Sequence, residues 1–493
     1  MFKDISAIRR ECVLNDAEKA FLDSPQKPIV LLQKKIGNSI AENVAPQINR
    51  LGAILPYTPL HILIFDMPDG LKNFPDALIM TSGNDSGVPI AINDDELENF
   101  ACDAVLSHNR RILMRADDSV MDFIENKPSM IRRSRGYAPL PIFYRGKGTI
   151  LAIGGELKNT FCLAKDNLLY ASPYIGDVSD LRTIEVLKSS IRRMSDLLEI
   201  KPEKIACDMH PRYQTTALAA EIAKNLGISL VKVQHHYAHV LSCMAENDFH
   251  GEIIGIAFDG TGYGTDNTIW GGEFFICDEK GFERVESIKS FTQAGGDRSS
   301  REGWRIAVAM MKDFSLAREL KLANDAEISG QKFLLDKNIN CVRSTSVGRL
   351  FDAIAAILNV CKVSSYEGEA AMRLQALAER SNKVFNAKFM TTDKIFDDIL
   401  IRRLNGENIC DLARLFHVNL AEMTAQVAEE LSKRTKIKTV ALSGGVFQNS
   451  LLSSLTAANL RRRGLKVLQH SMIPANDGGI CIGQAVYAMN FND

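Results

Sequence analysis

The sequence predicts an α/β protein built from more than one domain. Its 493 residues are enough for two to four domains with large hydrophobic cores. Residues 1–147 alternate between helical and strand patterns. Along the whole chain, short apolar runs of strand length lead directly into turns rich in glycine or hydroxyl side chains. Because a strand that ends in such a turn is a good anion cradle, we expect several phosphate-binding loops.

Composition and charge exclude several classes of protein. A content of 24% charged and 46% hydrophobic residues is ordinary for a globular enzyme. A net charge of −1 and a pI near 6.8 give no general attraction to nucleic acid or anionic membranes. The ten cysteines are scattered without a CxxC pair, which indicates reduced thiols and argues against a zinc finger. No 18-residue apolar run or signal-peptide core occurs, so we expect a cytoplasmic protein that does not span a membrane. From the charge we expect neither a membrane nor a nucleic-acid partner.

The first part of the chain holds two apolar runs that read as buried strands, residues 28–32 (PIVLL) and 77–80 (ALIM). The second run leads into residues 81–87 (TSGNDSG), whose side chains can donate to phosphate oxygens. The alternative is an ordinary polar loop. Two further strings, 115–120 and 132–139, add guanidinium groups that bind phosphates bidentately. The candidate nucleotide-binding residues of this part are Thr81, Ser82, Asn84, Ser86, Arg115 and Arg135.

A linker is expected at residues 144–148 (YRGKG) by composition. Residues 150–160 (ILAIGGELKNT) then read as a strand ending in a glycine pair, the shape of a phosphate-binding hairpin. Apolar positions between 184 and 198 fall on one face of a helix, which we expect to pack against a sheet. Residues 205–209 (IACDM) and 230–233 read as strands, and a helix containing three histidines follows.

His235 and His239 are four residues apart, so both imidazoles project from one face of that helix, an arrangement that can hold a divalent metal. The alternative is a pair of capped or surface histidines. A zinc protease of the HExxH type is excluded, because its general base must follow the first histidine and that position is His236.

Residues 253–264 (IIGIAFDGTGYG) form an apolar run that ends in Asp259 and a glycine-rich turn. Such a turn presents backbone N–H groups to phosphate oxygens, while the carboxylate can hold a bridging cation. The alternative is a tight hairpin whose glycines supply positive φ angles.

Two more loops lie near the end of the sequence. Residues 439–443 (TVALS) form an apolar strand that meets Gly444 and Gly445, where a nucleotide could approach the backbone closely. Residues 474–479 (PANDGG) open the last helix. Asp477 would cap that helix by default, and in this context it is also a candidate metal carboxylate.

Two sets of motifs resemble known families. The strings at 81–87 and 132–139 resemble the YrdC-type domain that forms carbamoyl-adenylate. Its first strands, with their basic motif, would precede Met1, so the resemblance implies an incomplete YrdC-like α/β domain over residues 1–147. The second set resembles actin-like ATPases (ASKHA) of the tRNA threonylcarbamoyl transferase branch, which implies a two-lobed actin-like domain over residues 148–493. It comprises GGELKNT (154–160), VQHHYAH (233–239), FDGTGYGTD (258–266), SGGVFQN (443–449) and NDGG (476–479).

Three further strings narrow the match to the HypF family of hydrogenase-maturation carbamoyltransferases: WGGE (270–273), SVGRLFDA (346–353) and SYEGEAAM (365–372). The family's acylphosphatase domain and paired CxxC modules are not in this sequence, which therefore resembles a C-terminal portion. The resemblance implies a route in three steps. Carbamoyl phosphate yields carbamate, carbamate and ATP yield carbamoyl-adenylate, and the carbamoyl group passes to the C-terminal cysteine of HypE as a precursor of the hydrogenase cyanide ligand.

The resemblance also implies roles for individual residues. His235, His239, Asp259 and Asp477 would hold one divalent metal, with iron, zinc and magnesium left open, and would form the catalytic site. The nucleophile belongs to the partner, so no cysteine of this chain is needed for attack. The alternatives are a tRNA threonylcarbamoyl transferase and an idle nucleotide-binding scaffold. The residues expected to line ATP or the adenylate are Gly154, Gly155, Asn159, Gly260, Thr261, Gly262, Gly444, Gly445 and Asn449.

Overall fold

The computed structural model of the chain describes residues 1–66, 74–85, 87–97, 100–387 and 389–491. By its internal contacts the chain divides into two units. Unit 1 comprises residues 1–233 and 470–493, and unit 2 comprises residues 234–469. None of the helices in the described residues is both long enough and apolar enough to cross a membrane.

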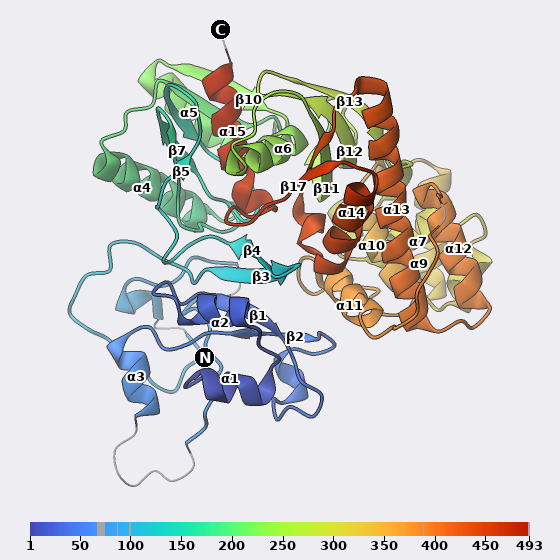
Figure 1. The fold of residues 1–493 in the computed structure, drawn as a ribbon, viewed down its shortest axis with the longest axis horizontal. Coiled ribbons are helices and arrows are strands. Elements are labelled where there is room, and N and C mark those ends of the chain that lie inside the picture. Colours follow the sequence, from blue (N-terminus) through green and yellow to red (C-terminus); the bar gives the residue numbers. More distant parts are fainter. Residues whose placement is uncertain (67–73, 86, 98–99, 388, 492–493) are drawn as a thin grey trace. The chain divides into compact units, whose positions relative to one another are not determined.

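Unit 1 begins with two short helices and a small sheet (Figure 1). Asp4 caps α1 (Ile5–Glu11), and Asn15 caps α2 (Asp16–Asp23) through a capping box. Ile8, Leu22, Val30 and Met121 are fully buried in a shared core. The predicted strand at 28–32 is confirmed within one residue. The sheet has the order β2-β1-β3-β4, with β1 Ile29–Gln33, β2 Arg50–Ala53, β3 Val120–Ile124 and β4 Lys127–Arg132.

The strand predicted at residues 77–80 is wrong. Between α3 (Pro59–Phe65) and β3, Ala77 forms only an isolated bridge with Phe2, and Ile79 is 79% exposed. An apolar run becomes a strand only where a neighbour completes its hydrogen-bond ladder. Among the described residues, no strand pairs with this segment beyond that bridge.

A second sheet of unit 1 carries the predicted hairpin. Helix α4 (Leu181–Leu198) packs Leu187 and Ile191 into its core, which confirms the predicted amphipathic helix. Helices α5 (Gln214–Leu226) and α15 (Ile480–Asn490) contact the same sheet. The strands have the order β10-β9-β6-β7-β8-β5, with β5 Ile142–Phe143, β6 Thr149–Ala152, β7 Cys162–Lys165, β8 Leu168–Ala171, β9 Lys204–Asp208 and β10 Ser229–Val233.

The boundary between the first two parts of the chain differs in detail from the expected linker. Strand β5 pairs with β8, and Tyr144 is buried. The segment just before residue 148 is therefore anchored to the second sheet. The domain limits of 1–147 and 148–493 stay a prediction.

Unit 2 is built on one mixed sheet of seven strands. Strand β11 (Ile253–Tyr263) lies inside it, antiparallel to β12 (Ile269–Cys277) and parallel to β16 (Thr439–Ser443), which confirms both predicted apolar strands. The order is β14-β15-β12-β11-β16-β17, with β13 (Phe282–Ser287) on β12, and the remaining strands are β14 Phe291–Ala294, β15 Cys341–Ser344 and β17 Lys466–Leu468.

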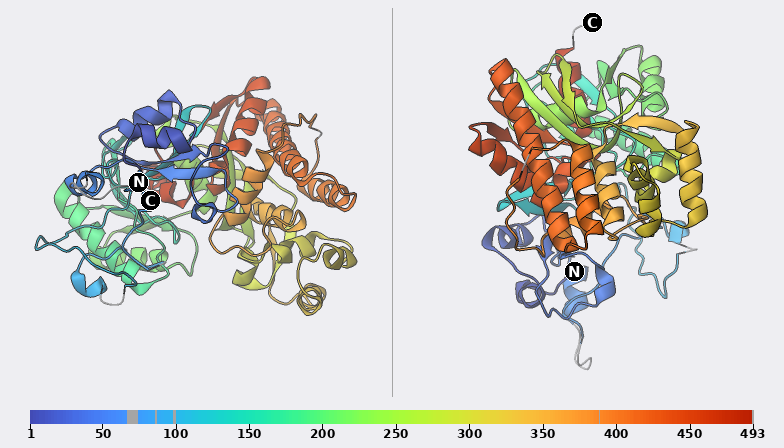
Figure 2. Two further views of the ribbon diagram at one scale, coloured as in Figure 1. Left: turned by 90° about the horizontal axis from the view of Figure 1, so that it is seen from below. Right: turned by 90° about the vertical axis from the view of Figure 1, so that its right-hand side faces the viewer.

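Helices cover both faces of β11. Ile254, Ile256 and Phe258 point into the large core of unit 2, which α10 (Val347–Ile357) and α13 (Ile409–Thr435) share. Successive side chains of a strand alternate between faces, so Gly255 points the other way, toward Val240 of α6 (His235–Glu246). Figure 2 shows α13 beside α12 (Thr392–Leu404), both in orange. The other helices of unit 2 are α7 Gly303–Met310, α8 Ser315–Glu319, α9 Asp325–Asp336, α11 Glu369–Ala378 and α14 Ser450–Arg462.

Candidate metal centre

Helix α6 positions the two candidate histidines. It begins at His235 because Gln234 caps it, accepting a hydrogen bond from the N–H of Tyr237 at 2.9 Å. The amide of Gln234 also donates to the backbone oxygen of Tyr263 at 3.1 Å, which ties the helix to the end of β11. His235 and His239 lie one turn apart, and each is 1% exposed. The predicted common face of the pair is confirmed.

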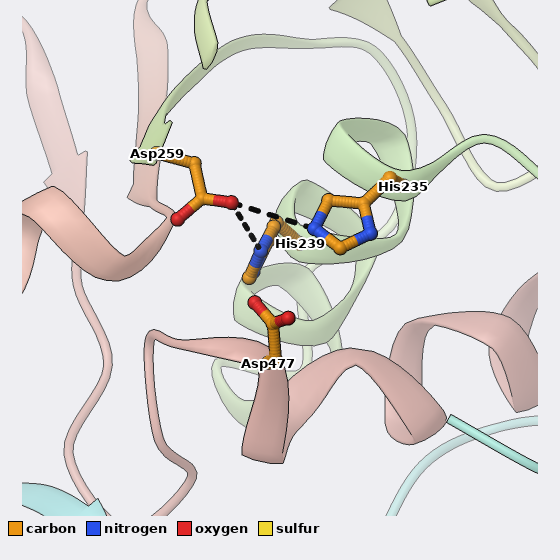
Figure 3. Close-up of side chains that lie close together, drawn as sticks. All are labelled: His235, His239, Asp259 and Asp477. Carbon is orange, nitrogen blue, oxygen red and sulfur yellow. Dashed lines mark ion pairs between the residues drawn. The ribbon is translucent and has the colours of Figure 1, made fainter. Parts of the chain in front are cut away.

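Strand β11 brings a carboxylate to the same place. Asp259 Oδ2 lies 3.4 Å from His235 Nε2 and 3.8 Å from His239 Nε2 (Figure 3). The ligand atoms of these three residues lie within 4.8 Å of one another. Two imidazoles and a carboxylate therefore converge on one point from two separate elements of unit 2.

The spacing of these atoms fits a bound divalent ion. Bonds of about 2.1 Å in a tetrahedral site place neighbouring ligand atoms about 3.4 Å apart. The two nitrogen-to-oxygen distances, 3.4 and 3.8 Å, are longer than ordinary hydrogen bonds and near that value. Imidazole nitrogen together with carboxylate oxygen is a donor set that iron and zinc accept readily. The described residues of unit 2 thus offer three ligands of suitable chemistry.

The backbone around Asp259 is fixed from two sides. Asp259 Oδ1 accepts a hydrogen bond from the N–H of Gly445 at 3.1 Å, so the other oxygen is the one that faces the histidines. The hydroxyl of Ser346 lies 3.2 Å from the backbone oxygen of Asp259 and donates to that of Gly260 at 2.7 Å. Sequence reasoning missed Ser346. The signal was its place before an apolar helical pattern, since it also caps α10.

The predicted end of the strand at Asp259 is wrong. Strand β11 continues to Tyr263, and its register with β12 shifts between Phe258 and Gly262. Strand β12 pairs on both sides of the shift, which extends the ladder past the glycines and leaves Gly260 and Thr261 in a bulge. The turn itself comes later, where Asn267 donates its N–H to the backbone oxygen of Gly264.

The loop after β16 approaches protein backbone closely. Gly444 has φ +95°, and a Cβ there would lie 2.2 Å from the backbone oxygen of Phe258. The loop continues as a short 3-10 helix, η4 (Gly445–Gln448), and Asn449 caps α14 by accepting from the N–H of Leu452 at 3.0 Å. Gly444 is therefore needed for close packing against β11, which is a different contact from the predicted approach of a nucleotide. Nucleotide contact by Gly444, Gly445 and Asn449 stays a prediction.

In unit 1, the glycine pair after β6 is fixed by the last helix. The N–H of Gly154 donates to Gln484 Oε1 of α15 at 2.8 Å. The amide of Asn159 donates to the backbone oxygens of Ile153 and Gly155, so this side chain holds the hairpin closed. Nucleotide contact by Gly154, Gly155 and Asn159 stays a prediction.

Asp477 also belongs to unit 1, at the start of the 3-10 turn η5 (Asp477–Gly479). A Cβ on Gly155 would lie 3.5 Å from its Oδ2. The default role as helix cap is wrong, because Asn476 caps the turn by accepting from the N–H of Gly478. Figure 3 also labels Asp477. That Asp477 is a metal ligand stays a prediction.

A cavity of about 260 Å³ in unit 1 gathers three of the candidate nucleotide residues: Ser82, Asn84 and Arg115. The amide of Asn84 donates to the backbone oxygens of Asp85 and Val88. Its Oδ1 is buried and has no hydrogen-bond partner among the described residues. An acceptor left in this state at a cavity wall can receive a hydrogen bond from a ligand.

The other candidates of this part lie elsewhere. Thr81 is exposed and is not among the residues lining the cavity, and Ser86 lies outside the described residues. Arg135 does not line the cavity either. Its guanidinium donates to Asp118 Oδ1 at 2.7 Å and to the backbone oxygens of Gln26 and Lys27. A phosphate would have to compete with these three acceptors.

The cavity is also lined by Arg132, which belongs to a string expected to bind phosphates, and by Tyr174, which sequence reasoning missed. The guanidinium of Arg132 lies 4.8 Å from the ring centre of Tyr174 and 3.2 Å from Asp117 Oδ1. Burial raises the pKa of Asp117, although Arg132 opposes this shift. Arg132 stands in the string singled out for its guanidinium groups, whereas Tyr174 follows β8 without a motif.

Two family strings contain buried acids with structural roles. Glu273 accepts from the N–H groups of Gly271 and Gly272 and from the hydroxyl of Thr345, and it pairs with Arg284. In SYEGEAAM, burial favours the neutral form of Glu369, but hydrogen bonds from Ser365 and the charge of Arg373 outweigh this effect and lower its pKa. Both carboxylates therefore tie neighbouring segments together.

Three sequence profiles match the chain in succession. The profile described as telomere recombination (Sua5, YciO, YrdC) matches residues 1–134, and the HypF Kae1-like domain matches residues 145–246. The profile described as carbamoyltransferase, Kae1-like domain, second subdomain, matches residues 255–484. This succession follows the predicted order, a YrdC-like part followed by the actin-like part.

Individual relatives match across nearly the whole chain. Carbamoyltransferase HypF of Rhizobium leguminosarum bv. viciae is 35% identical over 99% of this chain and 65% of its own length. Carbamoyltransferase HypF of Rhodobacter capsulatus is 38% identical over 98% of this chain and 65% of its own length. A HypF homolog of Cupriavidus necator is 34% identical over 68% of this chain and 90% of its own length. The chain thus spans slightly less than two thirds of the first two relatives.

Solved structures agree with these relatives. The crystal structure of full-length HypF in the phosphate- and nucleotide-bound form matches with a TM-score of 0.93 and 35% identity, over 99% of this chain and 78% of that one. HypF of T. kodakarensis matches with a TM-score of 0.91 and 33% identity, over 99% of this chain and 66% of that one. The predicted fold class is confirmed, and the chain belongs to the HypF family of carbamoyltransferases.

Proposed function

We propose that this chain transfers a carbamoyl group from carbamoyl-adenylate to the C-terminal cysteine of HypE during maturation of [NiFe] hydrogenase. The observation that carries the proposal is the convergence of His235, His239 and Asp259 in unit 2. Membership of the HypF family supplies the reaction class.

The proposed transfer is an acyl substitution. The cysteine thiol gives its proton to solvent, and the thiolate sulfur attacks the carbonyl carbon of the mixed anhydride. A C–S bond forms, and the bond from the carbonyl carbon to the phosphate oxygen breaks, so AMP leaves with the electron pair. The products are a thiocarbamate on the partner and AMP.

The residues of the candidate centre would hold a divalent cation, with Asp477 proposed as a further ligand. Such an ion supplies positive charge that orients the phosphate and polarises the carbonyl. Two imidazole ligands favour iron or zinc over magnesium. The N–H of Gly445 holds Asp259 Oδ1, which leaves Oδ2 directed at the histidines.

We also propose that the cavity of unit 1 takes part in making the adenylate. There, a carbamate oxygen would attack the α-phosphorus of ATP and pyrophosphate would leave. Arg115 and Asn84 both line the cavity. The guanidinium of Arg115 suits a phosphate, and the amide oxygen of Asn84 suits a hydroxyl or amine. Conversion of carbamoyl phosphate to carbamate is assigned to the acylphosphatase domain that the family resemblance implies.

Mass spectrometry of the acceptor tests the transfer. HypE, or a peptide ending in its cysteine, is incubated with the chain and carbamoyl-adenylate, with and without a chelator. The expected result is a mass increase of one carbamoyl group on the cysteine, lost with chelator. No increase, with the adenylate bound and the protein folded, would favour an idle scaffold or a tRNA acceptor, and tRNA would be tested next.

His235→Ala links the transfer to the candidate centre. The variant is expected to lose transfer and bound metal while keeping its fold, because one buried imidazole of the ligand set is removed. His250→Ala is the matched control, since His250 is a histidine of the same unit that pairs with Asp248 and Glu279. Transfer at the wild-type rate by a metal-free His235→Ala protein would contradict the assignment.

A further inference from the structure

A buried histidine outside the candidate centre has a fixed protonation state. His417 of α13 is fully buried, and its Nδ1 lies 2.8 Å from the backbone oxygen of Ala413. A carbonyl oxygen only accepts, so Nδ1 carries the hydrogen. The other nitrogen, Nε2, therefore accepts from the amide of Asn449 at 3.0 Å. Burial, with a contribution from Arg414, lowers the pKa of His417 to about 4, so the ring is neutral near pH 7.

Asn449 uses that contact to hold the end of a loop. Its Oδ1 accepts from the N–H of Leu452, its N–H donates to the backbone oxygen of Val446, and its own backbone oxygen accepts from Ser453. These bonds join η4 to the first turn of α14. The hydrogen bond to His417 then joins that corner to α13, the longest helix of the described residues.

The other end of the same loop touches Asp259. A Cβ on Gly444 would lie 2.2 Å from the backbone oxygen of Phe258, and the N–H of Gly445 donates to Asp259 Oδ1 at 3.1 Å. Residues 444–449 are therefore held by β11 at one end and by His417 at the other. Turning or shifting the Asn449 end would move the N–H that orients the carboxylate.

We propose that His417 is a positioning residue of the metal centre: it holds Asn449, and through residues 444–449 it keeps the N–H of Gly445 on Asp259. This inference rests on the proposed metal centre and deepens it. It also gives Asn449, expected from its motif to contact the nucleotide, a role in fixing the loop.

Substitutions at position 417 can separate a positioning role from simple filling of the core. An apolar side chain of similar size at position 417 would fit the surrounding core, where the ring already packs against Phe351 and Phe416. His417→Leu therefore removes the acceptor of Asn449 while keeping the core filled. His417→Gln keeps a side-chain acceptor, so it is the conservative variant expected to restore the contact.

The test is a titration of the chain with Co²⁺, followed by the visible absorption of the bound ion. His417→Leu is expected to bind Co²⁺ about tenfold more weakly than wild type, as is usual when a group that orients a ligand is lost. His417→Gln is expected to restore most of the affinity. Thr424→Val is the matched control, because Thr424 is equally buried on α13 and, within the described part of the chain, its hydroxyl bonds only to the backbone oxygen of Leu420 in its own helix.

Each outcome decides a separate point. Wild-type affinity and spectrum in His417→Leu would overturn the positioning role and leave the metal centre standing. A wild-type chain that binds no Co²⁺ would sink both. If His417→Leu does not fold, Asn449→Ser examines the same contact, because it keeps a capping oxygen and removes the amide that donates to His417 without adding a charge. It is expected to lose the same affinity, and unchanged binding would overturn the proposal.

Discussion

Gly262 lies against the ring of His236, so close that a Cβ added to the glycine would come within 2.3 Å of the ring carbon Cε1. The same Cβ would lie 3.0 Å from Cδ2 of His235. Strand β11 and helix α6 therefore meet at a position where only hydrogen fits. We expect this close contact to control how near the carboxylate of Asp259 comes to the imidazoles.

Gly262→Ala is expected to push the start of α6 away from β11. Overpacking of this kind costs about 1–3 kcal/mol of stability, and the displaced His235 should lower metal affinity strongly. Metal content and thermal unfolding measured on the same samples check both effects. Gly281→Ala is the control, because a Cβ there meets no atom within 4 Å. A Gly262→Ala protein with full metal content would show that the contact does not set the site.

Ser346→Ala should lower both stability and metal affinity. The hydroxyl caps α10 by accepting from the N–H of Arg349 at 3.0 Å, and it also holds the backbone of Gly260. Loss of a cap and of a buried hydrogen bond together costs about 2–3 kcal/mol. Urea unfolding and metal titration measure the two losses. Asn324→Ala removes the cap of α9, away from the centre, and should reduce stability alone.

Stability of unit 2 should depend on the protonation of His417. The folded pKa, about 4, lies below the ordinary value of 6.5, so the unfolded chain binds this proton first as pH falls. The free energy of unfolding is therefore not reduced by His417 above pH 6.5, and it falls as the pH drops from about 6.5 to 4. At pH 5 the reduction is about 2 kcal/mol. Urea unfolding near pH 7.5 and pH 5 measures it. Between these two pH values, His417→Gln should lose about 2 kcal/mol less stability than the wild type. The same pH dependence in both proteins would contradict a buried neutral ring.

Asn84→Ala should impair adenylate formation without affecting transfer from supplied adenylate. The substitution removes Oδ1, which has no partner among the described residues, and the two hydrogen bonds that the Asn84 amide donates within its loop. In a longer protein that carries out ATP–pyrophosphate exchange, the exchange rate should fall at least tenfold. Asn38→Ala is the control, since the amide of Asn38 bonds to the backbone oxygen of Lys35 and neither residue lines the cavity. Unchanged exchange would count against the cavity as the adenylate site.

Local patterns predicted the centre well where one element determines the geometry. The i, i+4 spacing was enough to place His235 and His239 on one face, because helical periodicity is local and does not depend on contacts with distant residues. The apolar run before Asp259 was enough to predict a buried strand. Its continuation past the glycines was not predictable in this way, because β12 supplies the extra pairs.

Residues whose role depends on distant partners were missed. Ser346 bonds to a carbonyl 87 positions away, and His417 to an amide 32 positions away. The capping position of Ser346 could predict the start of a helix but not the carbonyls to which the hydroxyl bonds, and His417 stands in none of the motifs. The prediction for residues 77–80 also failed because a distant partner decides the structure. Their apolar pattern indicates a strand, but among the described residues only Phe2 forms a bridge with them.

The burial of β11 on both faces has a kinetic consequence. Its backbone is paired with β12 on one edge and β16 on the other, while α6 and the large core cover its faces. Solvent deuterium can replace the amide hydrogens of the buried part of this strand, residues 253–259, only when the core of unit 2 opens. The slowest-exchanging amides of the unit should therefore lie on the strand that carries Asp259, and this side of the centre should persist as long as the fold itself.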